Sequence, residues 1–553
     1  MPSFVFVVAL LICSMSVLPP AQAEAWPTGP TPPSGADLRA AVGGLDRAMP
    51  AGLAWRAPAR LDALYSASGF EPLWTEPAAV DALRRAVSSA ERDGLSRHRL
   101  LPDARRDPFD GGVALTAAER ELRLSDTLFV LLDRLANGVA DARGLSPAVG
   151  EPIPWRDVAA IDMPALVQRL RRSRIRALID EARPDTPLYA RLRGALHAEL
   201  DAPPIASIGP GDTLQAGSAG ERVTRLRARL LPEGDLLPVS AEDGARWDDG
   251  LRSAVVAFQS RNGLDADGKV GRRTLARLDL SRRTRIDALR INLERARWFA
   301  RSTGDDDRVE VNIPDYRLRV HLDQQVVWQT SVIVGKRANR TPIFTSQLDT
   351  VVLDPTWTVP RSIVVASLYE EARADPAAFA AKGYRLRDEQ RVMHDPTAID
   401  WSTMTLDRFR YWVVQSPGPG NALGSVKFLF DNPYSVYLHD TPARHLFSET
   451  ERTMSHGCIR VQHPHHLEAL LLESRAGIDQ RTIAALRRDR DNVSLALDEP
   501  ITVALLYWTA DVDERGRLRL LPDPYQRDAP ILEALGEPDP GAPHSVRDPA
   551  GRA

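Results

Sequence analysis

"VKFLFDNPYSVYLHD" (residues 426–440) and "TMSHGCIRV" (453–461) decide how this chain is interpreted. The segments "VKFLF" and "SVYLHD" have the short apolar runs and Asn/Pro punctuation that predict β-strands leading up to the second stretch. That stretch holds Cys458, the only cysteine beyond the first two dozen residues. A lone cysteine beside His456 could be a nucleophile, a metal ligand, half of a disulfide or a small core residue.

The chain as a whole has an ordinary globular composition. Its 553 residues predict several domains, because a single core rarely grows beyond about 250–300 residues. The formal net charge of −3 gives no electrostatic reason to expect nucleic acid as a partner.

The N-terminus resembles a secretory signal. An apolar run, Phe4–Leu18, precedes Pro19-Pro20 and the small-x-small sequence Ala21–Ala23. The run is shorter than the roughly 20 residues that span a membrane. No Lys or Arg precedes it, and a buried N-terminal helix is the alternative. We expect export to the periplasm, or retention at the inner membrane if the signal is not cleaved. Cleavage removes Cys13, which would leave Cys458 without a disulfide partner in the chain.

The pattern of the remaining sequence predicts a multidomain α+β protein. Apolar residues spaced i, i+3, i+4 and i+7 indicate helices up to about residue 205, and period-two alternation indicates strands from about residue 308. The predicted segments are a signal (1–23), a linker (24–37), a helical scaffold (38–205), a three-helix module (212–280), a connecting helix (281–307), a mostly-β domain (308–485) with an inserted helical subdomain (361–410), a C-terminal extension (486–535) that packs on the scaffold or the β domain, and a disordered tail (536–553).

The 212–280 segment resembles the three-helix peptidoglycan-binding module. The similarity rests on the spacing Val255-x-x-Phe258-Gln259, Gly263-Leu264, Asp267-Gly268, Gly271 and Thr274. The resemblance implies wall binding, whereas a purely scaffolding role is the alternative.

A zinc site at His439, His445, His456 and Cys458 is one interpretation of the histidine-rich region. Structural zinc, however, uses ligand pairs at spacings such as His-x3–5-His and mostly more than one cysteine. His439 and His445 are separated by five residues, but with a single cysteine the pattern is weak.

A cysteine nucleophile fits the residue types better. The thiolate is the reactive form, and a nearby imidazole can accept the thiol proton. Gly457 lets the backbone approach a carbonyl closely, and Arg460 lies within reach of a substrate carboxylate. His439, at the end of a predicted strand, is the candidate base. An inert buried cysteine remains the alternative.

The motif His439, fifteen residues, then Ser455-His456-Gly457-Cys458 resembles the catalytic motif of the L,D-transpeptidases. The stretches "LDPTWTVP" (353–360) and "YWTADVD" (507–513) agree with the same family. The resemblance implies a mostly-β catalytic domain, preceded by a helical scaffold and a peptidoglycan-binding module, with a capping insertion over the cleft.

The resemblance also implies roles for individual residues. Cys458 would be the nucleophile, His439 the general base and acid, and the main-chain carbonyl of Asp440 the group that orients His439. His456 and Gly457 would form the floor of the site and the oxyanion hole. Substrate contacts would come from Arg460, Tyr437, Ser455 and Trp412. The family implies no metal and no cofactor.

The reaction implied is 3→3 crosslinking of peptidoglycan. The donor would be a tetrapeptide stem, the acceptor a meso-diaminopimelate amine, and carbapenems would acylate Cys458. Other wall-synthesis proteins are further candidate partners. L,D-carboxypeptidation, attachment of proteins to the wall and a non-catalytic wall-binding scaffold are the alternatives.

Overall fold

The computed structural model describes residues 31–46, 54–101, 107–109, 115–140, 161–236, 243–299, 307–489, 492–513 and 515–536. The predicted signal and most of the predicted tail lie outside these ranges. The chain divides into two compact units. The first comprises residues 1–85, 101–130 and 162–176, and the second comprises 86–100, 131–161 and 177–553. None of the helices in the described ranges has the length and hydropathy needed to span a bilayer.

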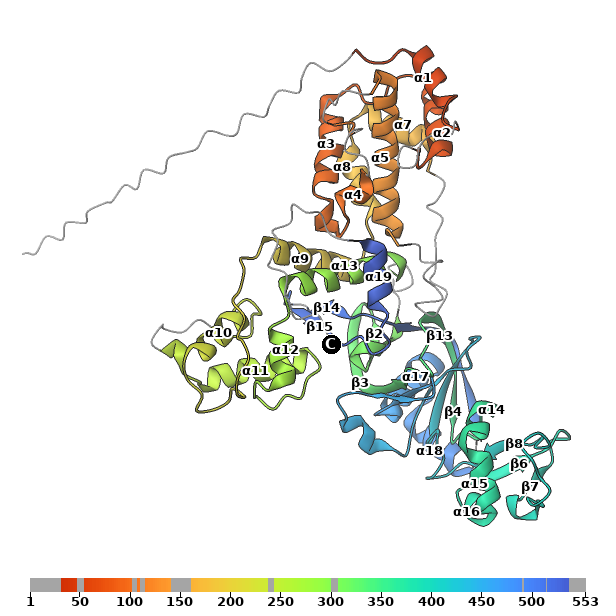
Figure 1. Ribbon diagram of the computed structural model, residues 1–553. Coiled ribbons are helices and arrows are strands. Elements are labelled where there is room, and N and C mark those ends of the chain that lie inside the picture. Colours follow the sequence, from red (N-terminus) through yellow and green to blue (C-terminus); the bar gives the residue numbers. More distant parts are fainter. Residues whose placement is uncertain are drawn as a thin grey trace, which may run out of the picture. The chain divides into compact units, whose positions relative to one another are not determined.

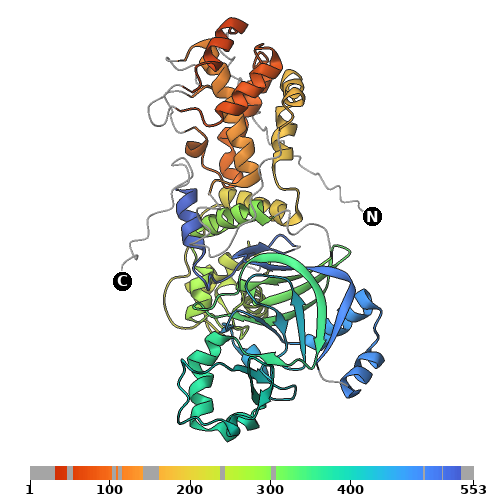
Figure 2. The same cartoon turned by 90° about the vertical axis from the view of Figure 1, so that its right-hand side faces the viewer.

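The predicted helical region is helical, as Figures 1 and 2 show. Its helices are α1 (Gly35–Val42), α2 (Pro58–Ser68), α3 (Pro77–Ser88), α4 (Arg97–Leu100), α5 (Ala117–Asn137), α7 (Met163–Arg171), α8 (Ile175–Ala182) and α9 (Pro187–Asp201). Within the first unit, Ser125 on α5 binds both the Tyr65 hydroxyl and the Trp74 indole N–H at 2.8 Å. These bonds satisfy polar groups that packing has buried.

The predicted three-helix module forms as expected from α10 (Glu221–Leu230), α11 (Asp249–Arg261) and α12 (Arg272–Leu278). The α11 stripe Leu251, Ala254, Val255 and Phe258 is buried in the module's own core. Gln259 explains the Asp-Gly turn that follows, because its side chain binds Asp267 and the backbone N–H of Gly268, each at 2.9 Å.

The mostly-β domain is a nine-stranded sheet in the order β11-β3-β12-β10-β9-β4-β13-β1-β2. The strands are β1 (Arg308–Asn312), β2 (Arg317–Leu322), β3 (Gln325–Gly335), β4 (Phe344–Leu353), β9 (Val426–Phe430), β10 (Leu438–His439), β11 (Thr453–Ser455), β12 (Ile459–Val461) and β13 (Val493–Leu506). The β2–β3 hairpin turns at Asp323-Gln324, and pairing of β2 with β3 closes the sheet on itself. Closure protects backbone groups that an open edge would expose.

The predicted boundary at residue 485 is wrong for this sheet. β13 pairs in parallel with β1 and antiparallel with β4, so a segment assigned to the C-terminal extension supplies an interior strand. Alternation alone could not identify its neighbours, because the parallel partner lies about 190 residues earlier in the chain. After β13 come a hairpin of β14 (Ala510–Val512) and β15 (Leu518–Leu520), and then α19 (Asp528–Leu535).

Helices cover the sheet and connect it to the preceding module. α17 (Pro464–Ala476) starts at a proline and buries Leu467, Leu471 and Leu472 in the core of the sheet. α18 (Gln480–Asp489) follows it. The predicted connecting helix is α13 (Arg282–Phe299), in which every residue from 289 to 299 is buried. In Figure 1, α13 lies beside α9 and α19, all within the second unit.

The sequence predicts a helical inserted subdomain, but the structure shows helices together with a small sheet. It contains α14 (Arg361–Ile363), a π-helical turn (Val364–Leu368), α15 (Tyr369–Ala374) and α16 (Pro376–Ala381). It also has its own antiparallel sheet, β5 (Trp357–Thr358), β8 (Trp412–Gln415), β6 (Tyr384–Arg387) and β7 (Met393–His394). Strands of two to four residues are too short for period-two alternation to predict.

Candidate active site

The register of three short strands brings together the candidate base and two cations. His439 on β10 pairs with Arg460 on β12 and with Lys427 on β9. Residues directly opposite in a sheet share a face, so the imidazole lies between the two cationic side chains. The neighbouring row, Leu438 with its partners Phe428 and Ile459, belongs to the buried core.

The pKa of His439 is lowered to about 4, first by burial and then by the Arg460 charge. Its Nδ1 lies 2.5 Å from the carbonyl oxygen of Asp440. A carbonyl can only accept a hydrogen bond, so Nδ1 carries the proton and Nε2 of the neutral ring is left as the acceptor. The side chain is therefore a neutral imidazole at pH 7 with a free basic nitrogen.

Asp440 is in turn held in place through its side chain. The Asp440 carboxylate accepts hydrogen bonds from Ser425 Oγ at 2.9 Å and from the Arg444 guanidinium at 2.6 Å. Gly424 (φ +62°) makes this approach possible, because a Cβ there would lie 2.3 Å from the carboxyl group. His439 thus has a fixed tautomer and a fixed ring orientation.

The loop between β11 and β12 presents Cys458. Ser455 Oγ accepts from the Gly457 N–H at 3.1 Å and donates to the Cys458 carbonyl at 2.5 Å, which closes a tight turn. Gly457 has φ +120°, a conformation that side-chain-bearing residues rarely adopt. The requirement for glycine before the cysteine therefore comes from backbone geometry.

The Cys458 thiol lies in a mixed environment. Burial raises its pKa, while hydrogen bonding to Tyr437 and the charge of Arg460 oppose that effect. Burial also raises the pKa of Tyr437, as does the neighbouring Cys458, and the Tyr437 hydroxyl accepts a hydrogen bond from Trp357. Both the thiol and the His439 ring are therefore uncharged at neutral pH.

His456 occupies a different environment. It is exposed, and its Nε2 lies 3.4 Å from Lys336 Nζ. Partial burial and the Lys336 charge lower its pKa. It directly follows β11 in the turn that leads to Cys458, whereas His439 ends β10.

The other residues predicted to contact substrate differ in their burial and in their nearness to Cys458. Arg460 lies beside the thiol and the imidazole, with its Nε buried and without a hydrogen-bond partner among the described residues. Ser455 is buried, and its hydroxyl is used within the turn. Trp412 is 45% exposed on β8, where the Arg387 guanidinium lies 5.7 Å from the centroid of its ring.

Lys427 and Ser435 are among the residues at the site that sequence reasoning missed. Lys427 Nζ lies 6.0 Å from the centroid of the Tyr437 ring, and its charge contributes to the low pKa of His439. The sequence does contain an indication of its role, because a lysine is unusual inside an apolar run such as "VKFLF". The carbonyl of Ser435 lies 3.9 Å from Cys458 Sγ, and no sequence pattern pointed to it.

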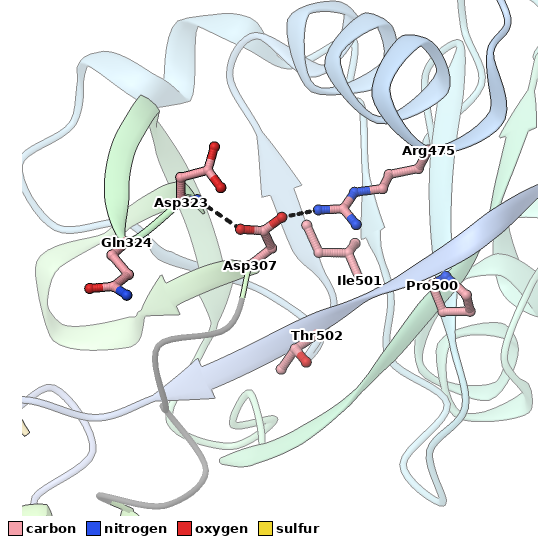
Figure 3. Close-up of a pocket in the computed structure, with 7 residues that line it drawn as sticks. All are labelled: Asp307, Asp323, Gln324, Arg475, Pro500, Ile501 and Thr502. Atoms are coloured by element: carbon pink, nitrogen blue, oxygen red, sulfur yellow. Dashed lines mark hydrogen bonds and ion pairs between the residues drawn. The ribbon is translucent and has the colours of Figure 1, made fainter.

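A separate hollow lies on the same domain (Figure 3). It is lined by Asp307, Asp323, Gln324, Arg475, Pro500, Ile501 and Thr502. Asp307 accepts from the Asp323 N–H at 2.9 Å and pairs with Arg475. None of the predicted catalytic residues contributes to it. Within the described ranges no three His, Cys, Asp or Glu side chains converge as metal ligands would.

Comparison with known proteins identifies the regions of the chain. Residues 306–477 match the family model of the L,D-transpeptidase catalytic domain (YkuD), residues 59–196 match a scaffold domain, and residues 219–278 match a "Putative peptidoglycan binding domain". The chain therefore contains an L,D-transpeptidase catalytic domain together with these two accessory domains, and that catalytic family implies a cysteine-dependent acyltransferase.

A relative named "Putative L,D-transpeptidase" from Haemophilus influenzae is 34% identical over 223 residues, which is 40% of this chain and 44% of the relative. Among solved structures, an L,D-transpeptidase from Stackebrandtia nassauensis is 17% identical, covers 53% of this chain and 94% of its own, and has a TM-score of 0.22. An L,D-transpeptidase from Xylanimonas cellulosilytica is 18% identical, covers 55% of this chain and 100% of its own, and has a TM-score of 0.17. Superpositions at these TM-scores add nothing to the assignment.

Proposed function

We propose that this protein is a peptidoglycan L,D-transpeptidase that works through a thioester on Cys458. The observation that carries the proposal is the strand register that places a neutral, carbonyl-oriented His439 beside the turn presenting Cys458. The match of residues 306–477 to the catalytic family supports the same chemistry.

The chemistry follows from the protonation states. His439 Nε2 takes the Cys458 proton as Sγ attacks the carbonyl of the diaminopimelate residue in a donor tetrapeptide. A tetrahedral oxyanion forms, and backbone N–H groups of the turn stabilise it. Its collapse forms the thioester and breaks the peptide bond to D-Ala, which leaves with the proton that His439 returns.

The second half of the reaction determines the product. The side-chain amine of an acceptor diaminopimelate attacks the thioester, loses its proton to His439 and restores the Cys458 thiol. This gives a 3→3 crosslink. Water in place of the amine would give L,D-carboxypeptidation, and an amine of a wall-attached protein would give protein attachment.

We assign recognition of the donor stem peptide to the cationic side chain of Arg460. The proposal for Arg460 is supported by its half-buried position and by its Nε, which has no hydrogen-bond partner among the described residues, since a guanidinium suits a stem-peptide carboxylate. The peptidoglycan-related domains indicate an extracytoplasmic, wall-associated protein. We infer that it acts in the periplasm after export by the predicted signal.

The experiment is incubation of the purified protein with disaccharide-tetrapeptide, followed by mass analysis of the products. A 3→3 dimer supports transpeptidation, tripeptide alone indicates carboxypeptidation, and unchanged substrate favours a non-catalytic wall-binding scaffold. Cys458→Ser is the matched control. Crosslinking that persists in this variant would contradict the nucleophile assignment.

A further inference from the structure

The peptide bond between Gly457 and Cys458 is held from outside the turn. Thr341, which follows β3 and is 0% exposed, donates its hydroxyl to the Gly457 carbonyl at 2.8 Å. The same Oγ1 accepts from the N–H of Gly335 at 2.8 Å. Both hydrogen-bonding roles of this hydroxyl are therefore used inside the protein, and neither is available to substrate.

A bond to the Gly457 oxygen also fixes the Cys458 N–H. The peptide unit is planar, so its C=O and N–H point in opposite directions and cannot turn independently. Within the part of the chain that the structure describes, the Cys458 N–H has no hydrogen-bond acceptor. A free N–H on the nucleophile's own residue is the group that a developing oxyanion requires. Donation to the carbonyl also polarises the amide and strengthens that N–H as a donor.

Thr341 itself is held by a residue outside the matched catalytic region. The Tyr525 hydroxyl accepts from the Thr341 N–H at 3.1 Å and donates to the Gly335 carbonyl at 2.6 Å. Tyr525 is 0% exposed and stacks on Tyr507 with ring centroids 5.7 Å apart. The buried guanidinium of Arg527 lies 5.2 Å from the Tyr525 ring.

We propose that Thr341 is a positioning residue that aims the Cys458 N–H at the oxyanion, and that Tyr525 from the C-terminal extension supports it. The inference rests on the proposed acyl transfer at Cys458. It adds that the oxyanion donor is set by residues of two other segments of the chain, one of which lies beyond residue 477, where the catalytic family match ends.

Two reactions of Cys458 separate this role from a general structural one. Acylation by a carbapenem passes through an oxyanion, whereas alkylation by iodoacetamide requires only an accessible, reactive sulfur. Both adducts are measured by intact mass on the full-length protein. The variants are Thr341→Val, which keeps the shape but removes the hydroxyl, and Thr341→Ser, which restores the hydroxyl.

We expect Thr341→Val to slow acylation by about tenfold or more, since loss of a direct oxyanion donor typically costs about 10²–10³-fold. Alkylation should stay within about twofold of the unsubstituted protein, and Thr341→Ser should acylate at nearly the original rate. Tyr525→Phe, a milder change, should show the same pattern with a smaller loss, and it provides a test if Thr341→Val does not fold.

Two outcomes would overturn the inference. One is acylation of both Thr341→Val and Tyr525→Phe at the original rate. The other is an equal fall in acylation and alkylation, which would mean that the loop has simply lost its structure. If the unsubstituted protein is alkylated but neither acylated nor able to process tetrapeptide, the proposed function fails instead.

Discussion

The strand around His439 and the turn around His456 offer two imidazoles to one thiol, in opposite settings. His439 is 5% exposed, lies between two cations and is oriented by a carbonyl, whereas His456 is exposed beside Lys336. His456 is nearer to Cys458 in the sequence, but only His439 has its tautomer set by a backbone acceptor. Nearness in sequence is therefore a poor guide to which histidine is suited to act as the base.

Removing each imidazole in turn tests whether the two histidines differ in their effect on Cys458. We expect His439→Ala to lower the rate of Cys458 acylation by about 10²–10⁴-fold, the usual contribution of a general base. His456→Ala should lower it by less than about fivefold, because its ring is not part of the proton transfer. Rapid-mixing mass measurements with a carbapenem check both variants. Equal losses would contradict the assignment of the base.

The environment of His439 also predicts how the free energy of unfolding changes with pH. Folded His439 has a pKa of about 4, below the value of about 6.5 for an unfolded chain. As the pH falls below about 6.5, the unfolded chain binds a proton that folded His439 does not, so stability declines until about pH 4. The loss attributable to this residue is about 3 kcal/mol. Denaturant unfolding at pH 7 and pH 4 should show it.

His439→Gln supplies the matched control for that measurement, since it keeps a buried polar side chain without a titrating group. Its stability should fall less between pH 7 and pH 4 than that of the unsubstituted protein. An identical fall in the two proteins would show that other groups account for the acid sensitivity.

Arg460 and Lys427 both lower the pKa of His439, and we expect the removal of Arg460 to have the larger effect. Replacing Arg460 by Gln should raise the pKa of His439 and shift the acid limb of the pH–rate profile to higher pH, by up to about one unit. Lys427→Gln should shift it in the same direction but less. The acylation rate measured from pH 4 to pH 8 checks this, and Lys336→Gln, beside His456, should leave the acid limb unchanged.

The smallest expected effect concerns the anchor behind His439. Ser425→Ala removes one hydrogen bond to the Asp440 carboxylate but leaves the Arg444 contact. We expect acylation to slow by about two- to fivefold, because the carbonyl that orients the ring becomes less firmly held. Single-turnover acylation rates are the measurement. A loss as large as that of His439→Ala would mean that the anchor has a further role.

Much of the architecture was predictable because it depends on local patterns. Helical periodicity, the Asp323-Gln324 turn and the buried stripe on α11 all follow from residues close together in the chain. The insertion's sheet was missed because its strands have only two to four residues. The interior position of β13 was missed because parallel partners can lie anywhere along a chain.

The sequence by itself determined the candidate nucleophile, the candidate base and the glycine between His456 and Cys458. Those predictions need only residue types at short or fixed separations. Only the tertiary structure decided that His439 is neutral, because its pKa is lowered first by burial and then by the Arg460 and Lys427 charges, which strand register brings from β12 and β9. It also decided what holds the turn: Thr341 reaches the Gly457 carbonyl from 116 residues away, a contact that no sequence spacing can encode.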